Sequence, residues 1–110
     1  MSVEHSVSAL TYTVSIWVAG DAREAETICR RYCKENPLCV TVTPTAFVYT
    51  GGAETGVLVR LVNYPRFPAP PAVINEHAYA LARALRDGLF QHSVMIERPE
   101  ESVWLTTRAP

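Results

Sequence analysis

The sequence lacks several features that mark particular classes of protein. Its 110 residues contain no run near the ~20 apolar residues of a membrane-spanning helix, so we expect no membrane partner. The opening residues include Glu4 and His5 in place of a long apolar stretch, and no secretory signal is expected. Three cysteines, an odd number, fit a reducing compartment better than a disulfide scaffold. We therefore expect a cytoplasmic protein.

An excess of charge of one sign is also missing. The net charge is −1, which argues against general nucleic-acid binding. Residues 38–75 are poor in charge, with only Glu54, Arg60 and Arg66, and this suggests a segment buried on more than one side. Because 48% of the residues are hydrophobic, the chain has enough apolar side chains to fill a core. We predict a single domain over residues 1–110, with 1–8 frayed.

No established catalytic signature and no internal repeat occur in the chain. The three histidines lack metal-ligand spacing relative to the cysteines, so no metal site is predicted. Without a recognisable signature, no cofactor and no catalytic residue is predicted either. Cys29 and Cys33 share one helix face and are expected to pack in the core. Only one alternative involves catalysis, namely a small enzyme that uses His77 or His92.

Hydrophobic periodicity predicts five strands and two helices. Alternation over residues 10–18 is typical of a half-buried strand, and Asp21 then suits the N-cap of a helix that ends before Pro37. A second strand follows to Thr50, where Pro44 indicates a bulge or an edge position. The remaining predicted elements are a glycine loop at 51–56, a strand at 57–62, a helix from Pro71 to about Phe90, and short strands at 94–96 and 103–105.

The order β-α-β-β-α-β-β indicates an α+β fold. Its first six elements match the ferredoxin-like βαββαβ plan, a two-layer sandwich of one antiparallel sheet with two helices on one face, here followed by an extra C-terminal strand. The alternative is another two-layer α+β sandwich with a different strand order.

The second face of such a sheet is predicted to be apolar. If Val57, Val59 and Leu61 face the helices, Leu58 and Arg60 face outward. The same pattern places on that face Trp17, Val62, Tyr64, Phe47, Tyr49, Met95 and Trp104. A soluble monomer rarely exposes so large an apolar patch, so we expect a homo-oligomer, with a symmetric dimer favoured. The alternative is that the C-terminal segment folds back over the patch.

Two neighbouring segments are the candidate ligand-binding site. Gly51 and Gly52 lie in a glycine-rich loop whose backbone N–H groups can face an anion, although a plain glycine-rich hairpin turn is the commoner explanation of such a loop. Downstream, a guanidinium lies beside an aromatic ring among prolines, a combination that suits a phosphate and a base. The predicted ligand-binding residues are Tyr49, Gly51, Gly52, Arg60, Tyr64, Arg66 and Phe67.

The segments Tyr49–Gly56 and Asn63–Pro68 resemble a pattern in short uncharacterised proteins of tailed phages and prophages. Residues 91–94 and 102–105 are similar to the C-terminal ends of those proteins. The resemblance covers about residues 38–107 and carries no established activity, so it assigns no functional residue. It implies a phage setting, in which accessory proteins of this size often block host defences inside the host cytoplasm.

Together these observations favour a non-enzymatic homo-oligomeric protein that sequesters a nucleotide-like anionic small molecule as an anti-defence factor. The alternatives are an inhibitor that binds a host protein, a small enzyme, or a virion assembly component. The sequence leaves open the identity of the ligand, the host target and the size of the oligomer.

Overall fold

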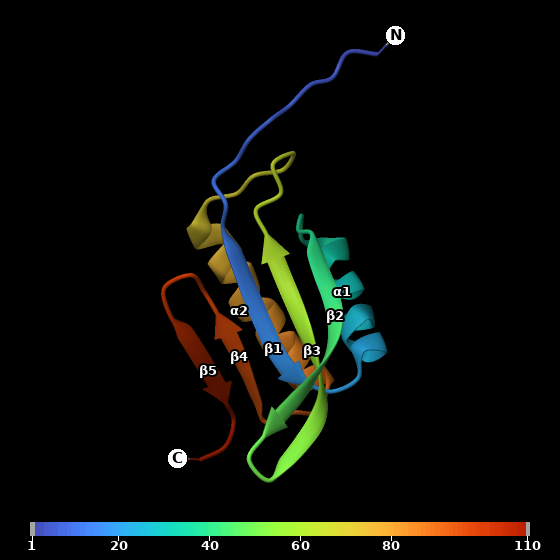
Figure 1. Ribbon diagram of the computed structural model, residues 1–110, viewed down its shortest axis with the longest axis vertical. Helices are drawn as coiled ribbons and strands as arrows, with labels where there is room; N and C mark the ends of the chain where they lie inside the picture. Colours follow the sequence, from blue (N-terminus) through green and yellow to red (C-terminus); the bar gives the residue numbers. More distant parts are fainter. Residues whose placement is uncertain (1, 110) are drawn as a thin grey trace.

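The computed structural model describes residues 2–109, which form one five-stranded antiparallel sheet with both helices against one face (Figure 1). In chain order the elements are β1 (Thr13–Ala19), α1 (Ala22–Glu35), β2 (Val40–Tyr49), β3 (Gly52–Val62), α2 (Pro71–Gly88), β4 (Ser93–Glu97) and β5 (Ser102–Thr106). The strand order is β2-β3-β1-β4-β5, with antiparallel neighbours throughout. The predicted ferredoxin-like α+β fold is confirmed, and β5 extends the sheet beside β4.

The core lies between the helices and the inner face of the sheet. Val14, Ile16 and Val18 of β1 are at most 2% exposed, whereas Trp17 between them is half-buried on the outer face. In α2, Leu81 is fully buried against this layer. Ala78 and Leu85, which lie about one helical turn before and after it, are fully buried too. The period of two in the strands and of 3.6 in the helices therefore decides which residues form the core.

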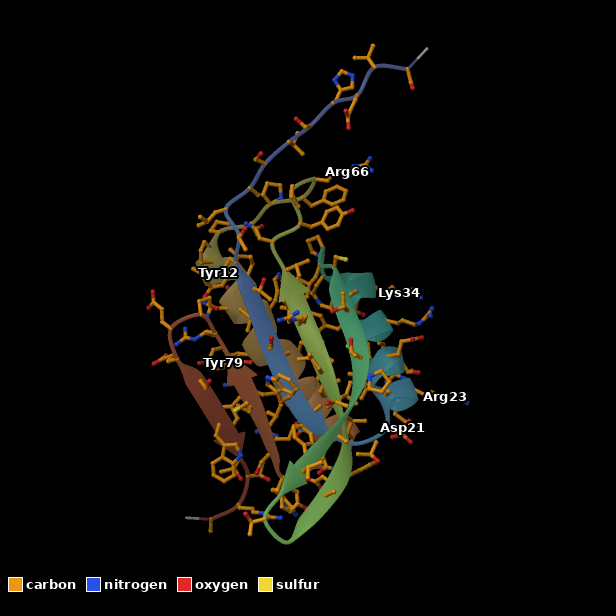
Figure 2. All side chains as sticks on the ribbon, in the orientation of Figure 1. Tyr12, Asp21, Arg23, Lys34, Arg66 and Tyr79 are labelled. Atoms are coloured by element: carbon orange, nitrogen blue, oxygen red, sulfur yellow. The ribbon has the colours of Figure 1, made fainter. Side chains whose placement is uncertain are left out.

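The helix ends follow their local chemistry. An oxygen of the Asp21 carboxylate accepts a hydrogen bond from the backbone N–H of Arg23 at 3.2 Å, so the predicted N-cap is confirmed (Figure 2). Helix α1 ends before Asn36 and Pro37, as predicted. Helix α2 begins at Pro71, where the missing N–H costs no helical hydrogen bond.

The β2–β3 hairpin differs from the predicted glycine loop. The turn consists of Thr50 and Gly51 alone, and Gly51 has φ +89°. Strand β3 therefore begins at Gly52, and the whole of 52–56 pairs with β2 in continuous register. The prediction of a loop over 51–56 was wrong, because one residue with positive φ is enough to reverse the chain. Gly52 and Gly56 therefore take extended conformations and pair with β2. Pro44 lies on the edge strand β2, one of its two predicted settings.

Residues 2–11 lie outside the helices and strands and extend away from the sheet, at the end opposite the β2–β3 turn (Figure 1). They include the segment predicted to be frayed. None of the helices within residues 2–109 has the length and apolar character needed to cross a membrane.

Candidate functional site

The outer face of the sheet carries a row of aligned side chains across its five strands, and four of the five are apolar. The register aligns Thr43, Leu58, Trp17, Met95 and Trp104 in that order, from β2 to β5. Three of them are half-buried, and Trp104 is 64% exposed. The alternative in which the C-terminal segment covers this face was wrong, because β5 hydrogen-bonds to the edge of the sheet and leaves the face open.

A cavity of about 520 Å³ opens along this row, lined by Trp17, Met95 and Trp104 and beside the β2–β3 hairpin. We call it the hairpin cavity. Its chemically distinctive side chains are three aromatic rings, one carboxylate and one guanidinium, from Trp17, Phe47, Trp104, Glu54 and Arg108. They come from β1, β2, β3, β5 and the segment after β5, so only the folded sheet brings them together.

The aromatic wall of the hairpin cavity is held by specific contacts. The rings of Phe47 and Trp17 meet edge to face, with centroids 6.3 Å apart and planes at 64°. Phe47 lies directly over Gly56, where an added Cβ would come 2.1 Å from the Cε2 atom of the ring. On the other side, the indole N–H of Trp17 donates to a carboxylate oxygen of Glu97 at 2.9 Å. Gly56 is thus needed for the close approach of the ring.

The polar side of the hairpin cavity is built by hydrogen bonds between the segments before β4 and after β5. The backbone N–H of Thr107 donates to the carbonyl of His92 at 2.8 Å. The hydroxyl of Ser93 donates to that of Thr106 at 2.9 Å, and the latter oxygen also accepts from the backbone N–H of Arg108 at 3.1 Å. These bonds place His92 and Arg108 on one rim of the cavity.

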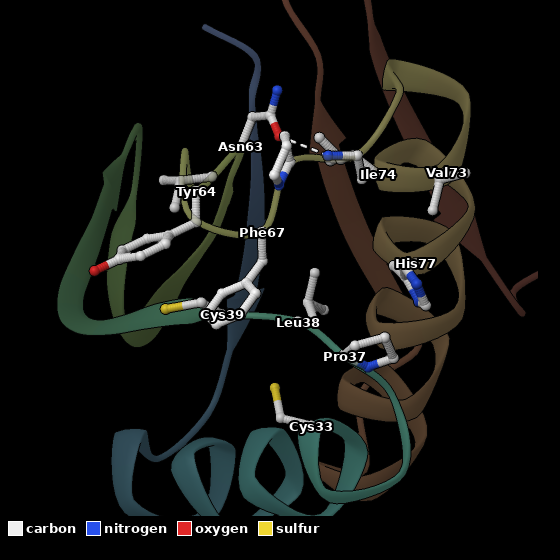
Figure 3. A pocket seen from close by; sticks show the side chains of 13 residues that line it. Cys33, Pro37, Leu38, Cys39, Asn63, Tyr64, Phe67, Val73, Ile74 and His77 are labelled. Atoms are coloured by element: carbon white, nitrogen blue, oxygen red, sulfur yellow. Dashed lines mark hydrogen bonds between the residues drawn. The ribbon is translucent and has the colours of Figure 1, made fainter. Parts of the chain in front are cut away.

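A second cavity, of about 550 Å³, lies at the opposite end of the sheet, between the start of α2 and the loop after β3 (Figure 3). We call it the loop cavity. Its lining is mostly apolar, with Leu38, Phe67 and Val73 among the residues that form it. The main polar group is His77, whose Nδ1 lies 2.7 Å from the hydroxyl of Tyr32, so the Nε2 atom is the one left for other partners. This cavity therefore suits apolar groups.

The predicted ligand-binding residues do not meet in one place. Tyr64 and Phe67 line the loop cavity, with their rings stacked at 6.3 Å, and the guanidinium carbon of Arg66 lies 5.4 Å from the Phe67 centroid. Tyr49, Gly51 and Gly52 lie instead at the hairpin turn. Arg60 is exposed near the C-terminal end of β3, within reach of the Ser15 hydroxyl at 3.4 Å. At about 3.3 Å per residue, β3 separates the two groups by roughly 33 Å. Their role in binding stays a prediction.

Sequence reasoning did not select the residues of the hairpin cavity as a site. It placed Trp17, Phe47 and Trp104 on the outer face but did not foresee that Glu54 and Arg108 converge with them. One signal was present, since Glu54 is the single acidic residue in the charge-poor stretch 38–75.

The three cysteines differ in exposure. Cys29 is buried in the core, as predicted, whereas Cys33, which was predicted to pack there with it, is only half-buried, and Cys39 is exposed. Burial raises the pKa of the Cys29 thiol to about 12, with a smaller contribution from Cys33. Burial also raises the pKa of Cys33, again with a smaller effect of Cys39. Among residues 2–109, no group of three or more His, Cys, Asp or Glu side chains is arranged to hold a metal ion.

Comparison with solved structures finds several proteins with a similar fold. A phage SAM lyase in its apo state aligns with a TM-score of 0.70 at 15% identity, covering 99% of both chains. The phage SAM lyase in complex with S-methyl-5'-thioadenosine aligns with a TM-score of 0.67 at 12% identity, covering 96% of this chain and 97% of that one. The periplasmic divalent cation tolerance protein CutA from Archaeoglobus fulgidus gives 0.52 at 16% identity, covering 92% and 88%. No protein-family model and no curated protein matches the sequence.

These comparisons establish the fold and bear on two predictions. The phage origin of the lyase agrees with the resemblance to phage proteins. The prediction of a non-enzymatic sequestering protein is contradicted, because the protein in both lyase structures is an enzyme. Sequence reasoning kept a small enzyme only as an alternative, because no established catalytic signature occurs in the chain. A catalytic site that is assembled from separate segments leaves no such signature.

Proposed function

We propose that this protein is an enzyme that cleaves S-adenosylmethionine (SAM) and releases S-methyl-5'-thioadenosine, with the hairpin cavity as its site. The observation that carries the proposal is the convergence of three aromatic rings with one carboxylate and one guanidinium in that cavity. The similarity in fold to the phage SAM lyase supports it.

Each part of SAM has a matching group in the hairpin cavity. The sulfonium is a cation, and the faces of tryptophan and phenylalanine rings attract cations. The negative charge of the Glu54 carboxylate also attracts the positive sulfonium. The guanidinium of Arg108 can pair with the carboxylate of the substrate, and the adenine can stack on an indole ring. The loop cavity, by contrast, has no carboxylate or guanidinium in its lining.

The chemistry explains why no acid–base signature is needed. When the bond between sulfur and the four-carbon amino-acid chain breaks, both electrons go to sulfur, and the sulfonium becomes a neutral thioether that leaves without a proton. The four-carbon fragment is completed either by its own carboxylate, which closes a lactone and needs no further base, or by transfer of a proton from its β carbon to a carboxylate or water, which forms an alkene. On the lactone route the protein acts mainly by orienting the substrate. Because the aromatic rings hold the cation more strongly than the neutral thioether, the product leaves more readily than the substrate.

Incubation of the purified protein with SAM, followed by chromatography and mass spectrometry, tests the proposal. We expect S-methyl-5'-thioadenosine to accumulate. The lactone and the alkene have the same mass, so the chromatographic retention of the second product, compared with standards of both compounds, tells one from the other. Glu54→Gln and Trp104→Ala should each lower kcat/KM by about tenfold or more, as expected when ~1.4 kcal/mol of interaction is lost. Glu26→Gln, a change of the same kind on the exposed face of α1, is the matched control and should leave the rate unchanged. Absence of the thioether product would refute the proposal.

A homo-oligomer that covers the outer face is part of this proposal. Trp104 is 64% exposed and Glu54 is exposed, so a ligand in the hairpin cavity of one chain stays open to water on one side. Binding sites usually bury 70–90% of a ligand of about this size. A second copy against the row that contains Leu58 would close the cavity and bury the row. Leu58→Lys should give monomers by light scattering and reduce cleavage, while oligomers that survive Leu58→Lys would contradict this interface.

In a phage setting, removal of SAM would deprive host methyltransferases of their methyl donor. We propose this as the route to an anti-defence role. The test is a host that expresses the protein: methylation of its DNA should fall, and it should not fall with the Glu54→Gln variant.

A further inference from the structure

Residues 2–11, which we call the arm, carry apolar side chains that the rest of the chain does not cover. Val3, Val7 and Leu10 are 77%, 68% and 70% exposed. In an extended segment alternate residues share a face, so Val3, Val7 and Ala9 lie on one side of the arm. An extended segment with its apolar side chains in water indicates a partner surface.

The base of the arm is fixed by Asn63, a residue that also lines the loop cavity. The side-chain amide of Asn63 donates to the carbonyl of Leu10 at 2.7 Å, and its backbone N–H donates to the carbonyl of Tyr12 at 3.1 Å. The carbonyl oxygen of the same side chain accepts from the backbone N–H of Ala69 at 2.9 Å. These bonds direct the arm away from the sheet, and Figure 1 shows it extending away from the body of the molecule.

The loop cavity has the chemistry to receive such an arm. Its walls include Leu38, Val62, Phe67, Val73 and Ile74, and its volume of about 550 Å³ suits several small apolar side chains. Phe67 is 70% exposed and Val73 38% exposed, so both gain from being covered. The exposed Arg66 lies at the same end of the molecule as the arm (Figure 2).

We propose that the arm of one copy occupies the loop cavity of a second copy. Val7 and its apolar neighbours would fill the cavity, and the carboxylate of Glu4 would pair with the guanidinium of Arg66 on the receiving copy. A second copy is the occupant we infer because Asn63 holds the arm on a course away from its own cavity. The bonds from Asn63 to the carbonyls of Leu10 and Tyr12 set the direction in which the arm leaves the sheet, and docking on another copy keeps that direction.

Cross-linking between two distinguishable chains tests the proposal. The donor chain carries Val7→Cys together with Cys33→Ser and Cys39→Ser. The receiving chain is lengthened by a tag and keeps Cys33 and Cys39, which line its loop cavity. The two are mixed and treated with a short bismaleimide, and the products are separated by denaturing electrophoresis. Cys29 is buried and its pKa is raised to about 12, so it does not compete.

We expect a donor–receiver adduct as the main product, and its loss when the receiving chain carries Cys33→Ser and Cys39→Ser. Two results would overturn the proposal. One is the absence of the mixed adduct. The other is an internal link within a chain that has both Val7→Cys and native Cys39, which would show that the arm covers its own cavity.

A pair of substitutions on α2 shows whether the cavity itself receives the arm. Val73→Glu puts a carboxylate at the wall, and the cost of covering an unpaired charge should lower the yield of adduct by about tenfold. Ala72→Glu adds the same charge one residue away, at an exposed position outside the lining, and should leave the yield unchanged. Equal yields from both variants would also overturn the proposal. SAM cleavage, measured on the same samples, reports separately on the hairpin cavity.

Discussion

The indole N–H of Trp17 donates a 2.9 Å hydrogen bond to Glu97, which lies diagonally across the β1–β4 ladder. Met95 is the residue directly opposite Trp17, and Glu97 is opposite Ser15. Diagonal neighbours are within reach of long side chains on one face of a sheet. The bond holds one edge of the indole and leaves the ring in contact with Phe47. One wall of the hairpin cavity is thus held in position from both sides.

Trp17→Phe should weaken the hold on SAM without unfolding the protein. The substitution keeps an aromatic ring but removes the N–H donor, and Glu97 is exposed, so water replaces the lost bond. We expect the free energy of unfolding to change by about 1 kcal/mol or less and KM for SAM to rise by about three- to tenfold. Glu97→Gln keeps an acceptor and is the control. An unchanged KM in Trp17→Phe would show that the orientation of the indole does not matter.

Gly56→Ala should disrupt the aromatic wall. The new methyl group would overlap the Phe47 ring, so the ring has to move, at a cost of about 1–3 kcal/mol in the free energy of unfolding. Urea denaturation measures that cost. Combining it with Phe47→Leu removes the clashing ring, and we expect the double variant to lose less stability than the sum of the single changes. Additive losses would mean that the two residues are not coupled.

The pKa of Cys29 predicts a loss of stability at high pH. The folded protein keeps this thiol protonated up to about pH 12, whereas the unfolded chain releases the proton near 9. The unfolded state therefore binds fewer protons above pH 9, and the free energy of unfolding should fall as pH rises from 9 to 12. Cys29→Ala should show a shallower fall over the same range. Parallel curves for the two proteins would contradict the shifted pKa.

The hydroxyl of Tyr12 donates a 2.7 Å hydrogen bond to the side-chain oxygen of Asn75 and so ties the segment before β1 to α2. Both residues are half-buried, and Tyr12→Phe should lower the free energy of unfolding by about 1 kcal/mol. Thermal or urea unfolding measures the change. In the background of Asn75→Ala the same substitution should have almost no effect, because the acceptor is already gone. A full effect in that background would assign the loss to packing instead.

Much of the fold was predictable because its signals are local. Alternation around Ile16, the cap at Asp21 and the proline at Pro71 each act within a few residues, and all three appear where the sequence predicted them. The extent of the glycine loop was not predictable in this way. Gly51 and Gly52 look alike in the sequence, yet only Gly51 takes a positive φ, since the pairing of β3 with β2 decides where the turn ends.

The grouping of site residues could not be predicted at all. Tyr49 and Tyr64 are close in sequence, but a strand of eleven residues, β3, lies between them and places them at opposite ends of the sheet. Glu54 and Arg108 are far apart in sequence and line one cavity. Sequence distance is a poor guide to contact once strands pair in a non-sequential order.

By itself the sequence determined the class of fold, the ends of both helices and which side chains lie on the outer face, because periodicity and capping depend on neighbours along the chain. The tertiary structure alone decided where the aromatic rings, the carboxylate and the guanidinium meet. Their meeting depends on the strand order β2-β3-β1-β4-β5, which aligns Trp17 with Met95 and Trp104, and on the contact between the rings of Phe47 and Trp17. Convergence of side chains from separate segments is a property of strand pairing, which no local pattern encodes.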